Sequence, residues 1–327
     1  MTKIGFIFPG QGAQYVGMGL DLYEKYQASR DIFDSANSAL GIDLKKICFE
    51  GPEEELTKTD ISQPVIVTTS IAALKALEHE MDSICRGGPL CPPSIQKGQP
   101  QGVVPTSAAG LSLGEYSALA AAGVLSFEDA VKLVYKRGQF MQAAAENNKG
   151  TMASVLGLSR EAVEKISKEA GVQIASINSP GQIVISGLTD NIGKAAEIAR
   201  AEGASRVVTL NVSGAFHSKY MEDAASRLEK ELEHVMFFKP KFAVLANATA
   251  GYQNNPEEIK KNLISQVTGS VLWEDSVRLM AKDGITIMLE IGPGTVLKGL
   301  VRRIDSNIKV YNIGKVKEIE EFINISK

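Results

Sequence analysis

A serine between two glycines is the residue of this sequence best suited to covalent chemistry. Ser112 is the centre of the sequence GLSLG (110–114), which runs into the alanine-rich stretch EYSALAAAG. In a Gly-x-Ser-x-Gly elbow the glycines permit a tight turn between a strand and a helix, and this turn exposes the serine oxygen. The backbone amide of the next residue, Leu113, is then placed to stabilise an oxyanion. The pattern predicts a serine nucleophile.

A serine that caps a helix is the alternative interpretation of Ser112. Five letters of this kind occur by chance in roughly one chain of this length in five. Pro105 and the polar Thr106 and Ser107 stand where a central parallel strand is expected to be apolar, which weakens the elbow. The alanines that follow favour a helix that ends at Gly123, which supports it. These residues alone leave both interpretations open.

A general base for this serine must come from the three histidines of the chain. His79 and His234 lie in charged helical segments, ALEHEMDS and KELEHVMF, and are expected to face solvent. His217 follows an apolar run in NVSGAFHSKYM and precedes a helix that Ser218 can cap, so we expect it in a strand-to-helix loop at the elbow's edge of the sheet. A helix N-terminus keeps an imidazole neutral, which suits a general base. A loop histidine without a role is the alternative.

An arginine occupies the apolar face of a predicted helix that begins at Ser126. At 100° per residue Arg137 falls among Ala130, Val134 and Met141. A buried guanidinium must be paired, because an unpaired buried charge costs several kcal/mol. One partner is an internal carboxylate, and the other is a substrate carboxylate held by two parallel hydrogen bonds.

The alternation of strands and helices predicts the scaffold that carries these residues. Apolar runs at 4–8, 242–247 and 286–291 alternate with helical stretches at 62–81 and 256–267. This order favours a mostly parallel sheet with helices on both faces.

A second pattern interrupts the first between residues 148 and 212. Apolar runs at 152–156, 172–177, 183–186 and 206–212 alternate with helical stretches at 159–169 and 189–201. The order is βαββαβ, which is typical of a ferredoxin-like unit. We therefore predict an α/β chain with a large subdomain at 1–147 and 213–327 and a small one at 148–212.

The composition excludes several classes of function. The 327 residues carry a net charge of −3, spread along the chain, so no global positive field exists for nucleic acid or an anionic membrane. Cys48, Cys85 and Cys91 form no C-x-x-C pair and no zinc spacing, and are expected to be free thiols in a reducing compartment. The sequence GQGAQYVG lacks the third glycine of a dinucleotide fingerprint.

The hydrophobic runs and the prolines add two expectations. The apolar run at the N-terminus is too short for a signal peptide, and no run approaches the roughly 20 residues of a membrane helix, so we expect a cytoplasmic protein. Residues 86–105 hold five of the twelve prolines and are predicted to form an irregular loop.

Seven blocks of the sequence, in order, resemble those of malonyl-CoA:acyl-carrier-protein transacylases. They are FPGQGAQYVGMG, QPVIVTTS, AAGLSLGEYSALAAAGVLSFEDAVKLVYKRGQFMQ, NSPGQIVISG, GAFHSKYM, QVTGSVLWEDSV and LEIGPGTVLKGLVRR. The resemblance extends from Ile4 to about Arg303. It implies an α/β-hydrolase-like large subdomain with a ferredoxin-like insert, in agreement with the order of elements above.

The resemblance also implies a reaction. Ser112 would be the nucleophile, His217 its base, and Arg137 the group that binds the malonyl carboxylate. Malonyl-CoA would acylate the serine, and the phosphopantetheine thiol of an acyl carrier protein would then collect the malonyl group in a ping-pong mechanism. No metal or redox cofactor is implied, and the protein is expected to be a monomer.

Further site residues follow from the matched blocks. The backbone amides of Gln11 and Leu113 would form the oxyanion hole, and the main-chain carbonyl of Gln266 would orient the histidine. Phe216 would crowd α-branched acyl groups. Leu111 stands where the family most often has histidine, and we expect it to tune activity rather than abolish it.

Other functions stay as alternatives. A serine esterase or thioesterase would need an acid between serine and histidine in chain order, and Asp190 lies there only inside the small subdomain. A non-catalytic carrier-binding module and a trans-acting polyketide acyltransferase are the others. Carrier proteins are acidic, so Lys298, Arg302 and Arg303 are candidates for a basic rim.

Overall fold

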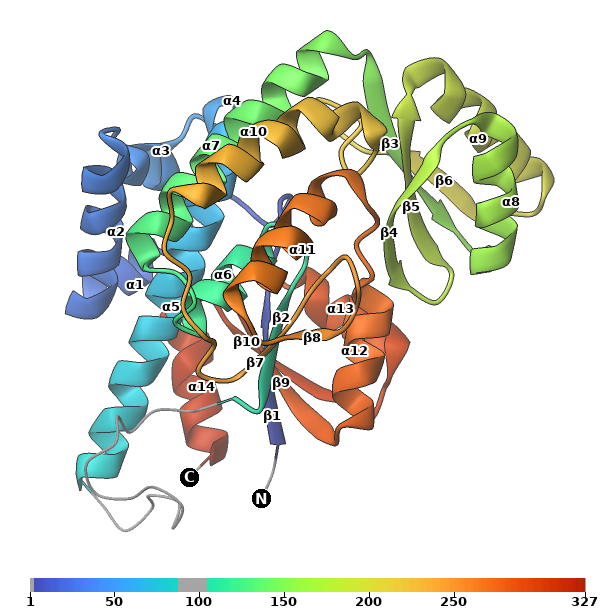
Figure 1. The fold of residues 1–327 in the computed structure, drawn as a ribbon. Helices are drawn as coiled ribbons and strands as arrows, with labels where there is room; N and C mark the ends of the chain where they lie inside the picture. The colour runs from blue at the N-terminus through green and yellow to red at the C-terminus, as the bar shows by residue number, and fades with distance from the viewer. Residues whose placement is uncertain (1–2, 88–104, 327) are drawn as a thin grey trace.

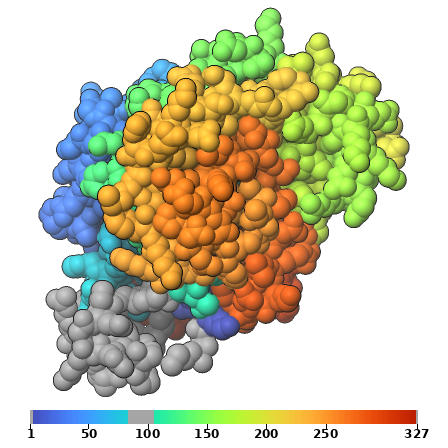
Figure 2. All heavy atoms as spheres, viewed as in Figure 1, coloured from blue at the N-terminus to red at the C-terminus, as the bar shows by residue number. Residues whose placement is uncertain are grey.

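The computed structural model describes residues 3–87 and 105–326. Two sheets organise it, a large sheet of six strands and a small sheet of four (Figure 1). The space-filling view shows the segments of the small sheet, in yellow-green, packed at one side of the rest (Figure 2). Backbone hydrogen bonds join the two parts, because Val271 exchanges them with Ala175 and Ile177 at 2.9 Å.

The large sheet is mostly parallel, as predicted. Its strands lie in the order β10 (Lys309–Ile313), β9 (Ile285–Ile291), β1 (Lys3–Phe8), β2 (Ser107–Gly110), β7 (Ala243–Leu245) and β8 (Tyr252–Gln253). Neighbours from β10 to β7 pair in parallel, and β8 pairs antiparallel with β7. All four residues of β2 are buried. Pro105 and Thr106 precede this strand, so they do not disturb the centre of the sheet.

Helices cover both faces of the large sheet (Figure 1). They are α1 (Leu20–Lys25), α2 (Gln27–Leu40), α3 (Leu44–Glu50), α4 (Glu53–Leu56), α5 (Thr59–Gly87), α6 (Gly114–Ala121), α7 (Phe127–Asn147), the 3₁₀ turn η1 (Lys219–Met221), α10 (Glu222–Glu233), α11 (Pro256–Thr268), α12 (Trp273–Lys282), α13 (Val296–Ile304) and α14 (Val316–Ser326). Across the described ranges, none is both long and apolar enough to cross a bilayer.

The alternation of side chains along β1 divides the core. Phe6 and Phe8 pack with residues of α5 and α7 on one face, whereas Ile7 packs with α12 and α13 on the other. A strand buried on both faces reads as a continuous apolar run, which is why the sequence KIGFIF predicted this strand.

The small sheet has the predicted βαββαβ order. Its elements are β3 (Gly150–Leu156), α8 (Arg160–Ala170), β4 (Gln173–Ser179), β5 (Gln182–Leu188), α9 (Thr189–Ala201) and β6 (Arg206–Thr209). The strands pair antiparallel in the order β4-β5-β3-β6. Both helices pack on one face of this sheet through a core of their own. The exact subdomain limits at 147/148 and 212/213 stay a prediction.

The proline-rich segment is largely outside the described residues. The prediction of an irregular loop at 86–105 falls mostly on residues 88–104, which include Cys91. Arg86 and Gly87 belong instead to α5, which extends beyond the helical stretch predicted at 62–81. Cys48 is a free, buried thiol.

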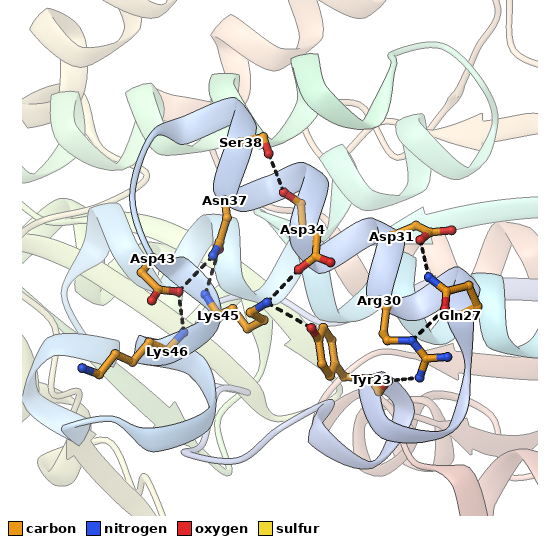
Figure 3. A network of polar contacts seen from close by, with 10 residues as sticks. All are labelled: Tyr23, Gln27, Arg30, Asp31, Asp34, Asn37, Ser38, Asp43, Lys45 and Lys46. Atoms are coloured by element: carbon orange, nitrogen blue, oxygen red, sulfur yellow. Dashed lines mark hydrogen bonds and ion pairs between the residues drawn. The ribbon is translucent and has the colours of Figure 1, made fainter.

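A polar network joins the first helices of the chain (Figure 3). Lys45 Nζ donates to Asp34 at 2.7 Å and to the Tyr23 hydroxyl at 3.0 Å, and Asn37 accepts from the Lys45 amide. Cys48, on the same helix as Lys45, accepts a hydrogen bond from the amide of Gly17 through its carbonyl. The helix that carries Lys45 therefore also holds Gly17, at the end of the loop that follows β1. This loop begins with the predicted oxyanion segment.

Candidate active site

The turn between β2 and α6 has the geometry of a nucleophile elbow. Ser112 has a φ of 51°, in the left-handed region. A Cβ at Gly110 would lie 1.9 Å from the carbonyl carbon of Gly114, and a Cβ at Gly114 would lie 2.2 Å from the Phe8 oxygen. Both positions therefore require glycine. The N-cap of α6 is Leu113 and makes no side-chain cap, so helix capping does not explain Ser112.

Ser112 and His217 meet across 105 positions of sequence. Ser112 Oγ lies 2.8 Å from His217 Nε2, and His217 Nδ1 lies 2.7 Å from the backbone oxygen of Gln266. Because a carbonyl only accepts, we assign the imidazole proton to Nδ1, which leaves Nε2 to accept the serine proton. The structure thus places the Gln266 carbonyl where a serine hydrolase has a carboxylate.

The imidazole is held neutral. Burial lowers the pKa of His217 from 6.5 to about 4, and the positive charge of Arg137 acts in the same direction. The carbonyls of Gln266 and Gly269 oppose this shift in part. Neutrality was predicted from a helix N-terminus, but its causes here are burial and the neighbouring cation.

The location of His217 corrects a second expectation. The loop that carries it follows β6 of the small sheet and enters the 3₁₀ turn η1, so it does not leave a strand of the large sheet. Its φ of 57° is again left-handed. Ser218 does accept from the amide of Tyr220, as a cap would.

Arg137 is buried and faces the serine. Its Nη1 donates to Gln63 Oε1 at 2.8 Å, and its Nη2 donates to Gln266 Oε1 at 3.1 Å and to Ser112 Oγ at 3.2 Å. In the part of the chain that the structure describes, it forms no ion pair with a carboxylate. Its neighbour Gly138 lets α7 approach α5, because a Cβ there would lie 2.5 Å from Asp60 Cα.

Burial also affects the electrostatics of this guanidinium. It lowers the pKa of Arg137, while Tyr116 and Glu115 act in the opposite direction. An arginine nevertheless keeps its charge in proteins. The site therefore presents a buried cation, hydrogen-bonded through Nη1 and Nη2 to two neutral amides, beside the Ser112 Oγ atom.

A cavity of about 290 Å³ opens between the two sheets and contains these groups. Ser112, His217 and Arg137 all line it, together with Met152 and Asn178 from the small sheet. Its size is at the lower end of ligand pockets, which suits a small acyl group.

The predicted oxyanion segment lies against the elbow. A Cβ at Gly10 would lie 2.4 Å from the Leu111 oxygen, so the two turns touch. Gln11 lines the cavity, and the Leu113 side chain is buried outside it. Within residues 3–87 and 105–326, neither the Gln11 amide nor the Leu113 amide has a hydrogen-bond acceptor.

The remaining predicted residues fall into two groups. Phe216 and Leu111 line the cavity. His79 and His234 are exposed, and Asp190 is exposed on α9, without contact to His217.

The candidate basic residues lie on α13. Lys298, Arg302 and Arg303 are all exposed, and Arg303 donates to the Gln182 side chain on the small sheet. No cluster of three or more His, Cys, Asp or Glu suited to a metal ion occurs in the described ranges.

Three site residues were missed by the sequence interpretation. Gln63 binds Arg137, and Asn247 holds both sides of the elbow: its Oδ1 accepts from the Ser112 amide at 2.6 Å, and its Nδ2 donates to the Gly110 oxygen at 2.7 Å. Glu115 is a fully buried carboxylate one position after the GLSLG sequence. A charged residue in an apolar stretch is the signal that singled out Arg137, and it applies equally to Glu115.

Comparison with known proteins places the chain in a family. Residues 5–80 and 94–318 match the model of the acyl transferase domain. The chain is 40% identical to a malonyl CoA-acyl carrier protein transacylase of Bacillus subtilis (strain 168) over 332 residues, covering 100% of this chain and 98% of the relative. The mixed α/β fold of two subdomains is shared with solved structures.

One of these structures is an acyl-carrier-protein-S-malonyltransferase from Bartonella henselae, with a TM-score of 0.90, 37% identity and 99% of each chain covered. Another is a malonyl-transacylase in complex with a type II PKS acyl-carrier protein, with a TM-score of 0.89, 33% identity, and 99% of this chain and 100% of that one covered. The chain belongs to the acyl transferase family and, within it, to the malonyl CoA-acyl carrier protein transacylases.

Proposed function

We propose that this chain transfers the malonyl group of malonyl-CoA to the phosphopantetheine thiol of an acyl carrier protein through a malonyl-serine intermediate. One observation carries the proposal: Ser112 Oγ lies within hydrogen-bond distance of both a neutral imidazole and a buried guanidinium that no internal carboxylate neutralises among the described residues. The names of the relatives, and the relative solved with an acyl-carrier protein, support the substrates.

The first half-reaction acylates the serine. His217 Nε2 takes the hydroxyl proton while Ser112 Oγ attacks the thioester carbonyl of malonyl-CoA. The amides of Gln11 and Leu113 stabilise the negative oxygen of the tetrahedral intermediate. As it collapses, the C–S bond breaks and the proton on His217 passes to the departing CoA sulfur.

The second half-reaction reverses these roles. His217 takes the proton of the carrier's thiol, the sulfur attacks the malonyl-serine carbonyl, and the ester bond to Ser112 breaks. The proton returns to the serine oxygen. The Gln266 carbonyl holds the imidazole in the same orientation for both transfers.

Arg137 supplies selectivity in this proposal. A malonyl group carries a free carboxylate, and the guanidinium offers two nitrogens that now face neutral side-chain oxygens. A charge-assisted pair is stronger than a hydrogen bond to a neutral amide, so the substrate carboxylate competes well for this position. An acetyl group leaves the cation without an anionic partner.

Replacing Arg137 with alanine is expected to lower malonyl transfer by a factor of about 10² to 10³ and to raise the relative use of acetyl-CoA. The buried cation is the group that distinguishes the two acyl chains. Acylation rates with both thioesters measure the ratio. Lys136→Ala, an exposed cation on the same helix, is the control. If the ratio of malonyl to acetyl transfer is the same in Arg137→Ala as in the unchanged chain, Arg137 does not bind the malonyl carboxylate.

Replacing Phe216 with alanine is expected to increase loading of an α-methyl malonyl thioester about 10-fold relative to malonyl-CoA. The aromatic ring lines the cavity beside His217, and its removal makes room for one methyl group. Competition between the two thioesters, read by mass spectrometry of the acylated protein, gives the ratio. If the branched substrate gains nothing, another residue limits the pocket.

The esterase alternative is tested by omitting the carrier protein. A serine esterase needs a carboxylate that orients the histidine, and Asp190 does not fill this role, because His217 Nδ1 faces the Gln266 carbonyl. A transacylase accumulates malonyl-Ser112 after mixing with malonyl-CoA and turns over only when carrier protein is added. Steady consumption of malonyl-CoA without a carrier would instead identify a hydrolase.

We propose three further properties on the same grounds. The mechanism needs no metal or redox cofactor, because the side chains above supply every proton transfer. The cytoplasmic location and monomeric state expected from the sequence and the resemblance stay proposals. Acyl transfer to a panel of carrier proteins decides between fatty acid and polyketide synthesis.

A further inference from the structure

A buried carboxylate lies directly behind the reacting residues. Glu115 is fully buried at the start of α6. Its Oε2 accepts from the Asn247 amide at 3.0 Å and from Gln266 Nε2 at 2.7 Å, and its Oε1 accepts from Gln253 Nε2 at 2.8 Å. No step of the proposed mechanism uses this residue.

The two glutamine amides are oriented so that Glu115 accepts a hydrogen bond from each. Gln266 Oε1 accepts from Arg137, which can only donate, so Gln266 Nε2 must face Glu115. Gln253 Oε1 accepts from Asn262, and in this arrangement Gln253 Nε2 also faces Glu115. A protonated carboxyl would therefore point its O–H at a donor. Burial raises the pKa of Glu115, but the three donors and the charge of Arg137 oppose that effect. Glu115 is the acceptor in all three hydrogen bonds.

Two of the donors connect this carboxylate to the catalytic pair. Gln266 holds His217 through its backbone oxygen, and its side-chain Nε2 also donates to the backbone carbonyl oxygen of Ser112 at 3.0 Å. Asn247 holds the Ser112 amide at 2.6 Å. Glu115 is thus the common acceptor of the two residues that fix the serine and the histidine.

We propose that Glu115 is a positioning residue of the transacylase: its carboxylate fixes Gln266 and Asn247, and through them the distance between Ser112 and His217. The inference rests on the proposed function, because the quantity that tests it is the kcat of malonyl transfer. The same cluster joins Arg137 to Glu115 through the Gln266 side chain, so the guanidinium makes no direct contact with this carboxyl group and remains open to a substrate carboxylate.

The chain offers a matched control for this proposal. Glu290 is also fully buried, and its carboxylate also accepts three N–H groups, from the amides of Leu297 and Lys298 and from Asn312 Nδ2. None of these three residues forms a hydrogen bond with Ser112 or His217. Removing the acceptor at Glu290 disrupts the core in a similar way without reaching the site.

The experiment compares Glu115→Met with Glu290→Met in the full chain. Each change keeps roughly the length of the side chain and removes the acceptor of three N–H groups. Glu115→Met is expected to lower kcat about 10²-fold, with a smaller change in KM for malonyl-CoA, because misplacement of reacting groups by an ångström costs about this much. Glu290→Met is expected to lower Tm while keeping kcat per folded molecule. The proposal is overturned if Glu115→Met has the kcat of the unchanged chain. It is also overturned if both variants lose the same factor of kcat per folded molecule.

A second pair of variants serves if Glu115→Met does not fold. In Glu115→Gln the new amide NH₂ faces Gln253 Nε2, and in Glu115→Gln/Gln253→Glu it faces a carboxylate that can accept it. The single change is expected to lower kcat and the double change to restore it to within about 10-fold. Equal kcat in the two variants overturns the proposal. Malonylation of the unchanged chain tests the function separately: if Ser112 is not acylated there, the function has failed, and not the role of Glu115.

Discussion

Replacing Ser112 with alanine is expected to lower malonyl transfer by a factor on the order of 10⁴ or more and to abolish the covalent adduct. The Oγ atom is the group placed between His217 and Arg137, and alanine has no atom that can bond to the acyl carbon. Intact-mass measurement after mixing with malonyl-CoA, followed by peptide mapping, locates the malonyl group.

Ser117→Ala is the matched control, because Ser117 is a buried serine on α6, close to the elbow but outside the cavity. It is expected to form the adduct at the rate of the unchanged chain. A stable malonyl adduct in Ser112→Ala, on any other residue, would contradict the assignment of the nucleophile.

Replacing His217 with alanine is expected to slow acylation of Ser112 by a factor of about 10³ to 10⁴. The variant retains the serine and the cation but has no acceptor for the serine proton. Stopped-flow mixing with malonyl-CoA measures the adduct rate. The second half-reaction is expected to recover partly near pH 9, because the acceptor thiol then ionises without a base. His234→Ala, an exposed histidine, is the control.

The pH dependence of the unchanged enzyme follows from the same residue. Since the pKa of His217 is lowered from 6.5 to about 4, kcat/KM for malonyl-CoA is expected to stay flat down to about pH 5 and to fall towards pH 4. The neutral, buried imidazole contributes stability that is complete above pH 6.5 and is lost as pH falls through 4. His217→Ala is expected to weaken this loss in thermal melts. An acid limb of kcat/KM near pH 6.5 would contradict the burial of the imidazole.

Residues with a strong local signal could be predicted from the sequence. Two glycines around Ser112 mark a turn that other residues cannot form, and Arg137 breaks an apolar helix face. Alternating apolar runs likewise predicted the order of strands and helices in both sheets. In each case the signal comes from residues that are close to the predicted one in the sequence.

Residues whose role comes from distant partners could not be predicted in this way. Gln63 and Asn247 are neutral amides, and each binds a group 74 or more positions away, so neither disturbs a local pattern. The neutrality of His217 was predicted, but its cause depends on burial between the two sheets and on Arg137. The sequence pattern alone does not show such proximity.

The two left-handed residues at the reaction centre link chemistry to thermal resistance. An L-amino acid held in this backbone region costs roughly 1–2 kcal/mol, and both Ser112 and His217 adopt it. Glycine would relieve the strain at either position, but it would remove the reacting side chain. The backbone strain at Ser112 and His217 therefore accompanies catalysis, and the reaction centre is a place where the fold gives up resistance to heat.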